Sequence, residues 1–130
     1  ITTVCDVDTR AAARVVTAVQ KAGGTAPVAI PDVRKVLESR DVDALVIAAP
    51  DPWHAPAALM ALDAGKHVYV EKPASHNPRE GELLVEAWKR AGKVVQMGNQ
   101  RRSWPNVKMA IALVHEGRIG RVYTARTWYA

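Results

Sequence analysis

Short apolar runs alternate with longer amphipathic stretches along the whole 130-residue chain. The short runs are rich in β-branched residues, as strands are, and the longer stretches have the apolar spacing of helices. The pattern predicts strands over residues 1–5, 28–30, 43–49, 67–71, 94–97 and 121–129. It predicts helices over residues 11–22, 31–39, 55–64, 78–91 and 105–116.

Capping residues support the predicted helix ends. Asp8 or Thr9 is placed to cap the first helix, and Gly23 follows its last turn. Asn77 precedes Pro78 and is followed three residues later by a glutamate, which is typical of a helix start. Both helices are therefore bounded by residues that satisfy the free backbone groups of a helix end.

Strict alternation of strand and helix predicts an α/β fold with a doubly wound parallel sheet and helices on both faces. Residues 44–49 are apolar throughout, which is typical of a strand buried on both faces. Because crossover connections are right-handed, the carboxyl ends of all the strands meet at one edge of the sheet.

Polar side chains follow four of the predicted strands, and ligands bind at this edge of an open sheet. The four clusters are Asp6, residues 51–54, Glu71 with Lys72, and residues 99–102. Pro73 cannot donate to a sheet, so the strand before it ends with Glu71 and Lys72 at its carboxyl end. There Lys72 is a candidate hydrogen-bond donor or proton carrier, and the plainer alternative is a surface Glu–Lys pair.

Asp6 is a candidate cofactor ligand because a carboxylate at a strand end accepts hydrogen bonds from a ribose diol. Its charge also repels a 2′-phosphate, so NAD is favoured over NADP; the alternative is that Asp6 only caps a turn. No glycine-rich phosphate loop precedes it, and Gly23–Gly24 ends a helix rather than starting one. His54 is a candidate proton carrier, cofactor contact or helix cap. Residues 99–102 suit the hydroxyls or anions of a substrate, or form a solvated loop.

Composition and charge exclude several other classes of protein and of binding site. With 18 basic and 13 acidic residues the net charge is +5, but no basic stripe interleaved with aromatic residues points to nucleic acid. The single cysteine, Cys5, excludes an internal disulfide and is expected to be buried. The four histidines lie on different elements, so no metal site is predicted. The sequence contains no run of about 18 apolar residues, so no membrane-spanning helix is predicted.

The chain begins at Ile1 and ends at Ala130 inside strand-like runs, so we expect an interior piece of a longer protein. We expect that protein to be cytoplasmic, or periplasmic or secreted if a signal peptide precedes Ile1.

Three motifs together resemble the Gfo/Idh/MocA family (glucose–fructose oxidoreductase, inositol dehydrogenase and rhizopine-catabolism proteins). They are Glu71-Lys72-Pro73 after a strand, Pro50-Asp51-Pro52-Trp53-His54, and the run Gln96-Met97-Gly98-Asn99-Gln100-Arg101-Arg102. Residues 75–82 together with the last run are similar to the branch that includes the NAD-dependent glycosidases of glycoside hydrolase family 109. The resemblance covers nearly the whole chain.

The resemblance implies a Rossmann domain for NAD(P) over residues 1–120 and the start of an α/β substrate domain over residues 121–130. It implies that the first strand with its glycine loop lies before Ile1, and that a catalytic Asp–His pair lies after Ala130. It also implies a homo-oligomer assembled through the C-terminal domain.

The family's site residues carry over onto this sequence by motif. The cofactor contacts implied are Asp6, Pro50, Asp51, Trp53, His54, Glu71, Lys72, Pro73, Asn99 and Gln100, although the family more often has Asn at the position of Asp51. Lys72 is implied as the catalytic lysine between nicotinamide and substrate, and Arg101 and Arg102 as substrate contacts. A cis Lys72–Pro73 bond is expected at the bend after the strand.

The implied activity is hydride transfer between NAD(P) and a hydroxyl carbon of a sugar or polyol, with NADP the less favoured cofactor. One alternative is a glycosidase that works by oxidation, elimination and re-reduction with tightly held NAD. The other is a non-catalytic nucleotide-binding module, against which the intact Glu71–Lys72 pair argues.

Overall fold

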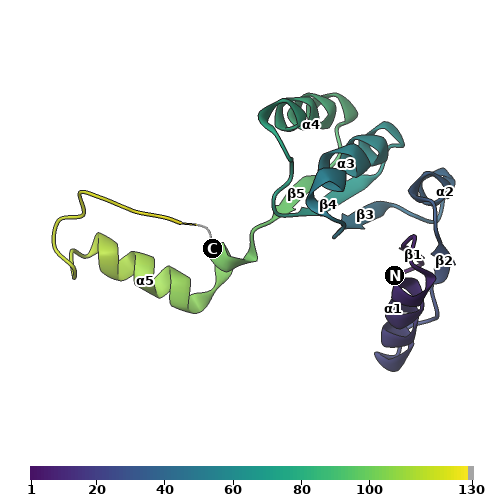
Figure 1. The fold of residues 1–130 in the computed structure, drawn as a ribbon, viewed down its shortest axis with the longest axis horizontal. Coiled ribbons are helices and arrows are strands. Elements are labelled where there is room, and N and C mark those ends of the chain that lie inside the picture. Colours follow the sequence, from purple (N-terminus) through teal and green to yellow (C-terminus); the bar gives the residue numbers. More distant parts are fainter. Residues whose placement is uncertain (129–130) are drawn as a thin grey trace. The chain divides into compact units, whose positions relative to one another are not determined.

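A computed structural model describes residues 1–128 of the chain, which form two compact units, residues 1–98 and residues 99–128. In the first unit the elements are β1 (Thr3–Cys5), α1 (Thr9–Lys21), β2 (Val28–Ile30), α2 (Val33–Glu38), β3 (Ala44–Ile47), the short 3-10 helix η1 (Asp51–Trp53), α3 (His54–Asp63), β4 (His67–Glu71), α4 (Pro78–Ala91) and β5 (Val95–Gly98) (Figure 1). The second unit holds η2 (Gln100–Ser103) and α5 (Pro105–His115). The predicted domain boundary after residue 120 remains a prediction.

All the strand pairs of the described chain are parallel, as the alternating pattern predicts. The strands form two sheets, however: a pair of β1 and β2, and a three-stranded sheet in the order β3-β4-β5. This arrangement matches positions 3-2 and 4-5-6 of the doubly wound order 3-2-1-4-5-6. The α/β Rossmann class is therefore confirmed, while pairing of all strands into one continuous sheet is not observed.

The main core lies between the three-stranded sheet and two helices that pack on one face of it, α3 and α4 (Figure 1). Alanines line α3 where it meets the sheet, and Ala58 and Ala61 are fully buried. Small side chains at these positions let the helix lie close to Val70 of β4, which is also fully buried. The face that α3 and α4 cover therefore carries Val68 and Val70, and the alternate residues of β4 point to the other face.

Burial on both faces, expected for residues 44–49, is wrong for the described chain. Ile47 is buried against the core, but Val46 on the opposite face is 72% exposed. In the described chain α3 and α4 cover only one face of this sheet. The continuous run of apolar residues is therefore buried on one face of the strand only.

The predicted caps are confirmed. The side chain of Asp8 accepts a hydrogen bond from the backbone N–H of Arg10 and caps α1, and Asn77 accepts from Glu80 at the start of α4. Asp32 caps α2 in the same way, through Arg34. These carboxylates and amides satisfy N–H groups that lack partners within the helix.

Two other local predictions are wrong. Residues 121–128 form no strand, because no other strand of the described chain pairs with them; Tyr129 lies outside the described residues. Cys5 is exposed rather than buried.

The second unit contains no buried side chain in α5. None of the helices in the described chain combines the length and the apolar character needed to cross a bilayer.

The Asp32 cap generates a pH-dependent contribution to stability. Hydrogen bonds from the side chain and backbone of Arg34 lower the pKa of Asp32 to about 2. Because this pKa lies below the ordinary value of about 4, the stabilisation is complete above about pH 4 and is lost as the pH falls towards 2. Asp32→Ser keeps a capping oxygen but does not titrate. We expect the difference in unfolding free energy between wild type and Asp32→Ser, measured by urea titration, to shrink between pH 4 and pH 2. A difference that is constant over this range would contradict the assignment.

Candidate functional site

The candidate site lies at the carboxyl edge of the three-stranded sheet. The register pairs Ile47 of β3 with Val70 of β4, and Glu71 of β4 with Gly98 of β5. Because the strands are parallel, the segments that follow them leave from the same edge. Residues 50–54 and Glu71 with Lys72 are thereby brought to one rim, as the sequence predicts.

Lys72 lies at this rim immediately after the central strand, and its side chain is exposed. Among residues 1–128, no ion pair and no side-chain hydrogen bond involves Lys72. Lys72 is therefore not tied up in an ion pair with Glu71, and whether the two residues form a site or only a surface Glu–Lys pair stays a prediction. The Lys72–Pro73 peptide bond is cis, which confirms that expectation.

Glu71 and Tyr69 lie on the same face of β4, over Gly98 of the neighbouring strand. A Cβ atom at Gly98 would lie 2.5 Å from Tyr69 Oη and 3.0 Å from Glu71 Oε1. The missing side chain at Gly98 is therefore what admits both polar groups. Sequence reasoning did not select Tyr69 or Gly98, although Tyr69 precedes Glu71 by two residues and strand alternation places them on one face.

His54 begins α3 and is almost completely buried, with 1% of its surface exposed. Its ring contacts two main-chain carbonyls: Nε2 lies 2.7 Å from the oxygen of Ala49, and Nδ1 lies against the oxygen of Pro73. The predicted role as a helix cap is not observed, since no side chain caps this helix. In the described chain the ring contacts the protein's own backbone, so its predicted contact with a cofactor stays a prediction.

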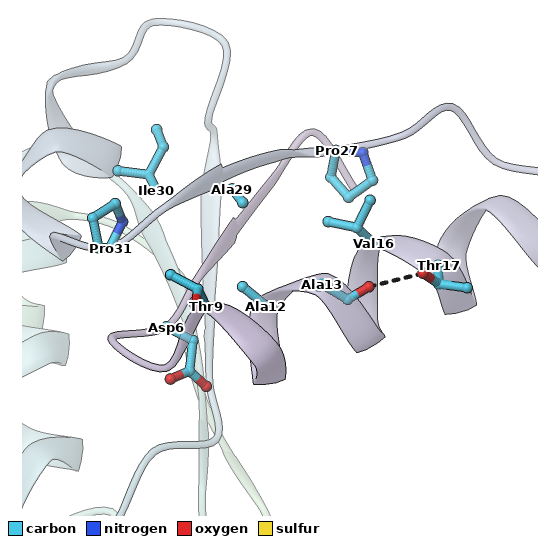
Figure 2. Close-up of a pocket in the computed structure, with 10 residues that line it drawn as sticks. All are labelled: Asp6, Thr9, Ala12, Ala13, Val16, Thr17, Pro27, Ala29, Ile30 and Pro31. Carbon is cyan, nitrogen blue, oxygen red and sulfur yellow. Dashed lines mark hydrogen bonds between the residues drawn. The ribbon is translucent and has the colours of Figure 1, made fainter.

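Asp6 follows β1 and borders a pocket of about 380 Å³ between α1 and the β1–β2 sheet. Figure 2 shows Asp6 at one end of this pocket, with Val16 and Pro27 towards the other end and the carboxylate directed away from them. The pocket is lined by Asp6, Thr9, Ala12, Ala13, Val16, Thr17, Pro27, Ala29, Ile30 and Pro31. One carboxylate oxygen, Oδ1, accepts a hydrogen bond of 2.8 Å from the backbone N–H of Asp8. Asp6 therefore closes a turn and still presents acceptor sites to solvent, since a carboxylate has room for about four hydrogen bonds.

Cys5 directly precedes Asp6. The pKa of its thiol is raised above the ordinary value, first by partial desolvation and then by the nearby carboxylates of Asp32 and Asp6. The thiol is therefore held in its neutral form, which is the less reactive one.

Residues 99–102, the fourth predicted cluster, belong to the second unit. Arg101 lies over the ring of Trp104, with its guanidinium carbon 5.8 Å from the ring centre. The predicted places of Asn99, Gln100 and Arg102 at the site remain predictions. Among the residues that the structure describes, no three histidine, cysteine or acidic side chains gather as metal ligands would.

Comparisons with known proteins assign the chain to a family. The sequence profile described as "Oxidoreductase family, NAD-binding Rossmann fold" matches residues 1–99. A glycosyl hydrolase family 109 protein of Saccharopolyspora erythraea is 37% identical over 94% of this chain and 28% of its own length. Inositol 2-dehydrogenase 3 of the same organism is 36% identical over 92% of this chain and 34% of its own.

Solved structures agree with the sequence comparisons. The WlbA dehydrogenase of Bordetella pertussis, crystallised with NADH and UDP-GlcNAcA, superposes with a TM-score of 0.76 and 28% identity. The match covers 95% of this chain and 34% of that one. The chain thus spans about a third of the length of these proteins.

The close approach over Gly98 predicts a coupling between two residues. Gly98→Ala forces Tyr69 and Glu71 to move and is expected to lower the free energy of unfolding by about 1–3 kcal/mol. In a Tyr69→Leu background, where the two nearest atoms are absent, the same change is expected to cost markedly less. Urea unfolding of the four variants in a double-mutant cycle measures this coupling. Equal costs in the two backgrounds would show that Tyr69 does not limit the space at Gly98.

Proposed function

This chain belongs to the oxidoreductase family with an NAD-binding Rossmann fold (Gfo/Idh/MocA), and on that premise we propose a reaction for the protein that carries it. The proposed reaction is hydride transfer between a nicotinamide cofactor and the hydroxyl-bearing carbon of a sugar or polyol. The sugar or polyol class is supported by the inositol dehydrogenase relative and by the WlbA dehydrogenase, which was crystallised with a nucleotide sugar.

One observation carries the proposal: Lys72 lies at the carboxyl edge of the central strand, and its exposed side chain is free of ion pairs within residues 1–128. An ammonium there is available to donate a hydrogen bond to the oxygen of a bound substrate. Negative charge builds up on that oxygen as its proton leaves, and a fixed donor stabilises it. The proton itself passes to a base other than Lys72, since an ammonium has no free site for it.

The residues around Asp6 fit a dinucleotide. The carboxylate keeps acceptor sites for the two hydroxyls of a ribose after its bond to the Asp8 N–H. The next residue, Val7, is 88% exposed and brings no positive charge for a 2′-phosphate. These features support NAD over NADP. When bound, the nicotinamide supplies the hydride chemistry, and the chain's part is to hold and orient it.

The remaining rim residues receive proposed roles from their positions. Glu71, held over Gly98 beside Tyr69, presents an acceptor to the cofactor. Further cofactor contacts are proposed for Pro50, Asp51, Trp53, Pro73, Asn99 and Gln100, and substrate contacts for Arg101 and Arg102. Asp51 and Trp53 lie in η1 and are exposed, so both are accessible to a ligand.

A second activity is supported by one specific observation. The family 109 glycosyl hydrolase is 37% identical and aligns with 94% of this chain, including the segment after β5. The same rim serves a glycosidase in which oxidation of the sugar precedes bond cleavage and is later reversed. The two activities differ in whether the cofactor is consumed.

The role of Lys72 predicts a selective loss of turnover. In the protein that carries this chain, Lys72→Ala is expected to lower kcat by about 10²–10³-fold, because a transition-state donor is removed. The KM for NAD is expected to change little, since Asp6 and the rest of the rim are intact. Steady-state kinetics measures this loss. The control is Lys89→Ala, which removes an exposed lysine of α4 and so reports any general effect of lost charge. Near-normal turnover of Lys72→Ala would remove Lys72 from the mechanism.

Cofactor balance distinguishes the two activities. A dehydrogenase is expected to form one NADH for each sugar or polyol oxidised, whereas the glycosidase releases free sugar with no net NADH. Absorbance of NADH and chromatography of the products, measured on the same reaction with a polyol and with a glycoside, give both quantities. Release of sugar without NADH would favour the glycosidase.

A further inference from the structure

His54 is the only buried polar or charged residue among those that the structure describes. Both ring nitrogens face main-chain carbonyl oxygens: Nε2 faces Ala49, and Nδ1 faces Pro73. Ala49 lies just beyond β3, and Pro73 directly follows Lys72. The ring therefore bridges the two segments that leave the sheet at the candidate site.

The number of protons on the ring follows from these partners. A carbonyl oxygen only accepts hydrogen bonds, whereas a neutral imidazole has one N–H donor and one nitrogen with a lone pair. A neutral ring would therefore set a lone pair against one of the two carbonyls, inside a site that excludes water. An imidazolium donates to both oxygens, and these two charge-assisted bonds act against the cost of burying its charge.

We propose that His54 is a positioning residue, held as an imidazolium, which joins the Ala49 and Pro73 carbonyls and so fixes the main chain beside Lys72. The inference rests on the proposed role of Lys72 for its functional consequence, but the bridging itself does not. Loss of the donor to either carbonyl would loosen the connection between the two segments.

None of the charged groups near His54 bonds its ring, so the ring alone connects the two carbonyls. On β4, His67, Tyr69 and Glu71 lie on the face opposite Val68 and Val70, against which α3 packs. Lys72 follows this strand, directly before Pro73, and its side chain is exposed. No titratable group lies in β3. Asp51 precedes His54 in η1, and Asp63 at the end of α3 forms an ion pair with Arg90 of α4. The other charged residues of the neighbouring helices are Arg79, Glu80, Glu82, Glu86 and Lys89 in α4, and Arg34, Lys35 and Glu38 in α2. No hydrogen bond or ion pair within residues 1–128 joins any of these groups to the ring of His54.

Nuclear magnetic resonance of the protein that carries this chain, labelled with ¹⁵N in histidine, tests the protonation directly. Both ring nitrogens of His54 are expected to carry a proton at neutral pH, each with an N–H signal that exchanges slowly because the ring is buried. The assignment comes from the signals lost in His54→Asn. A single ring proton at neutral pH would overturn the proposal, and this result does not depend on enzyme activity.

Two substitutions separate the two bonds. The amide nitrogen of His54→Asn occupies the place of Nδ1 and keeps a donor for Pro73, whereas that of His54→Gln occupies the place of Nε2 and keeps one for Ala49. Since the bond to Pro73 is the one adjacent to Lys72, His54→Gln is expected to lower kcat by about 10²-fold, as a misplaced catalytic group does. His54→Asn is expected to retain several-fold more activity, and the KM for NAD should change little in either variant.

The same pair of changes at His115, an exposed residue at the end of α5, is the control. Equal kcat values for His54→Asn and His54→Gln would overturn the positioning role. If neither variant folds, the ring signals of the wild-type protein, assigned through bonds from the His54 backbone, decide the matter. Failure of the proposed function is distinct, because Lys72→Ala would then turn over normally whatever the protonation of His54.

Discussion

The register of the parallel ladder from β3 to β5 is the constraint on which the site depends. Side chains alternate between the two faces of a strand, so a slip of one residue in β4 would exchange them. Val68 and Val70 would then leave the core, and Tyr69 and Glu71 would enter it. The apolar surface of α3 opposes this slip, because it offers no partner to the hydroxyl of Tyr69 or the carboxylate of Glu71.

Backbone groups, rather than pairs of opposite charges, shape the rim. The Ala49 and Pro73 carbonyls meet at the ring of His54, and the space over Gly98 receives Tyr69 and Glu71. The charged ends of Glu71 and Lys72 take no part in ion pairs of the described chain. Such groups stay available to a ligand, and their positions are set by the strand and the turn that carry them.

Local signals predicted the helices and their ends well, because capping depends on residues close in sequence. Asp8, Asp32 and Asn77 each bond a backbone N–H two or three residues away. Predictions that depended on contacts between segments far apart in the sequence were less accurate. The strand expected after residue 120 has no neighbour to pair with in the described chain, and the outer face of β3 carries an exposed Val46.

The sequence by itself determined the parallel α/β class, the capped helices, and the placement of Glu71 and Lys72 at a strand end, because periodicity, capping and proline act over a few residues. Its motifs also sufficed to indicate the oxidoreductase family. Only the tertiary structure decided that His54 is buried between two carbonyls, that Tyr69 shares the space over Gly98, and that Cys5 is exposed. Each of these depends on segments far apart in the chain, and no local pattern encodes which of them come into contact.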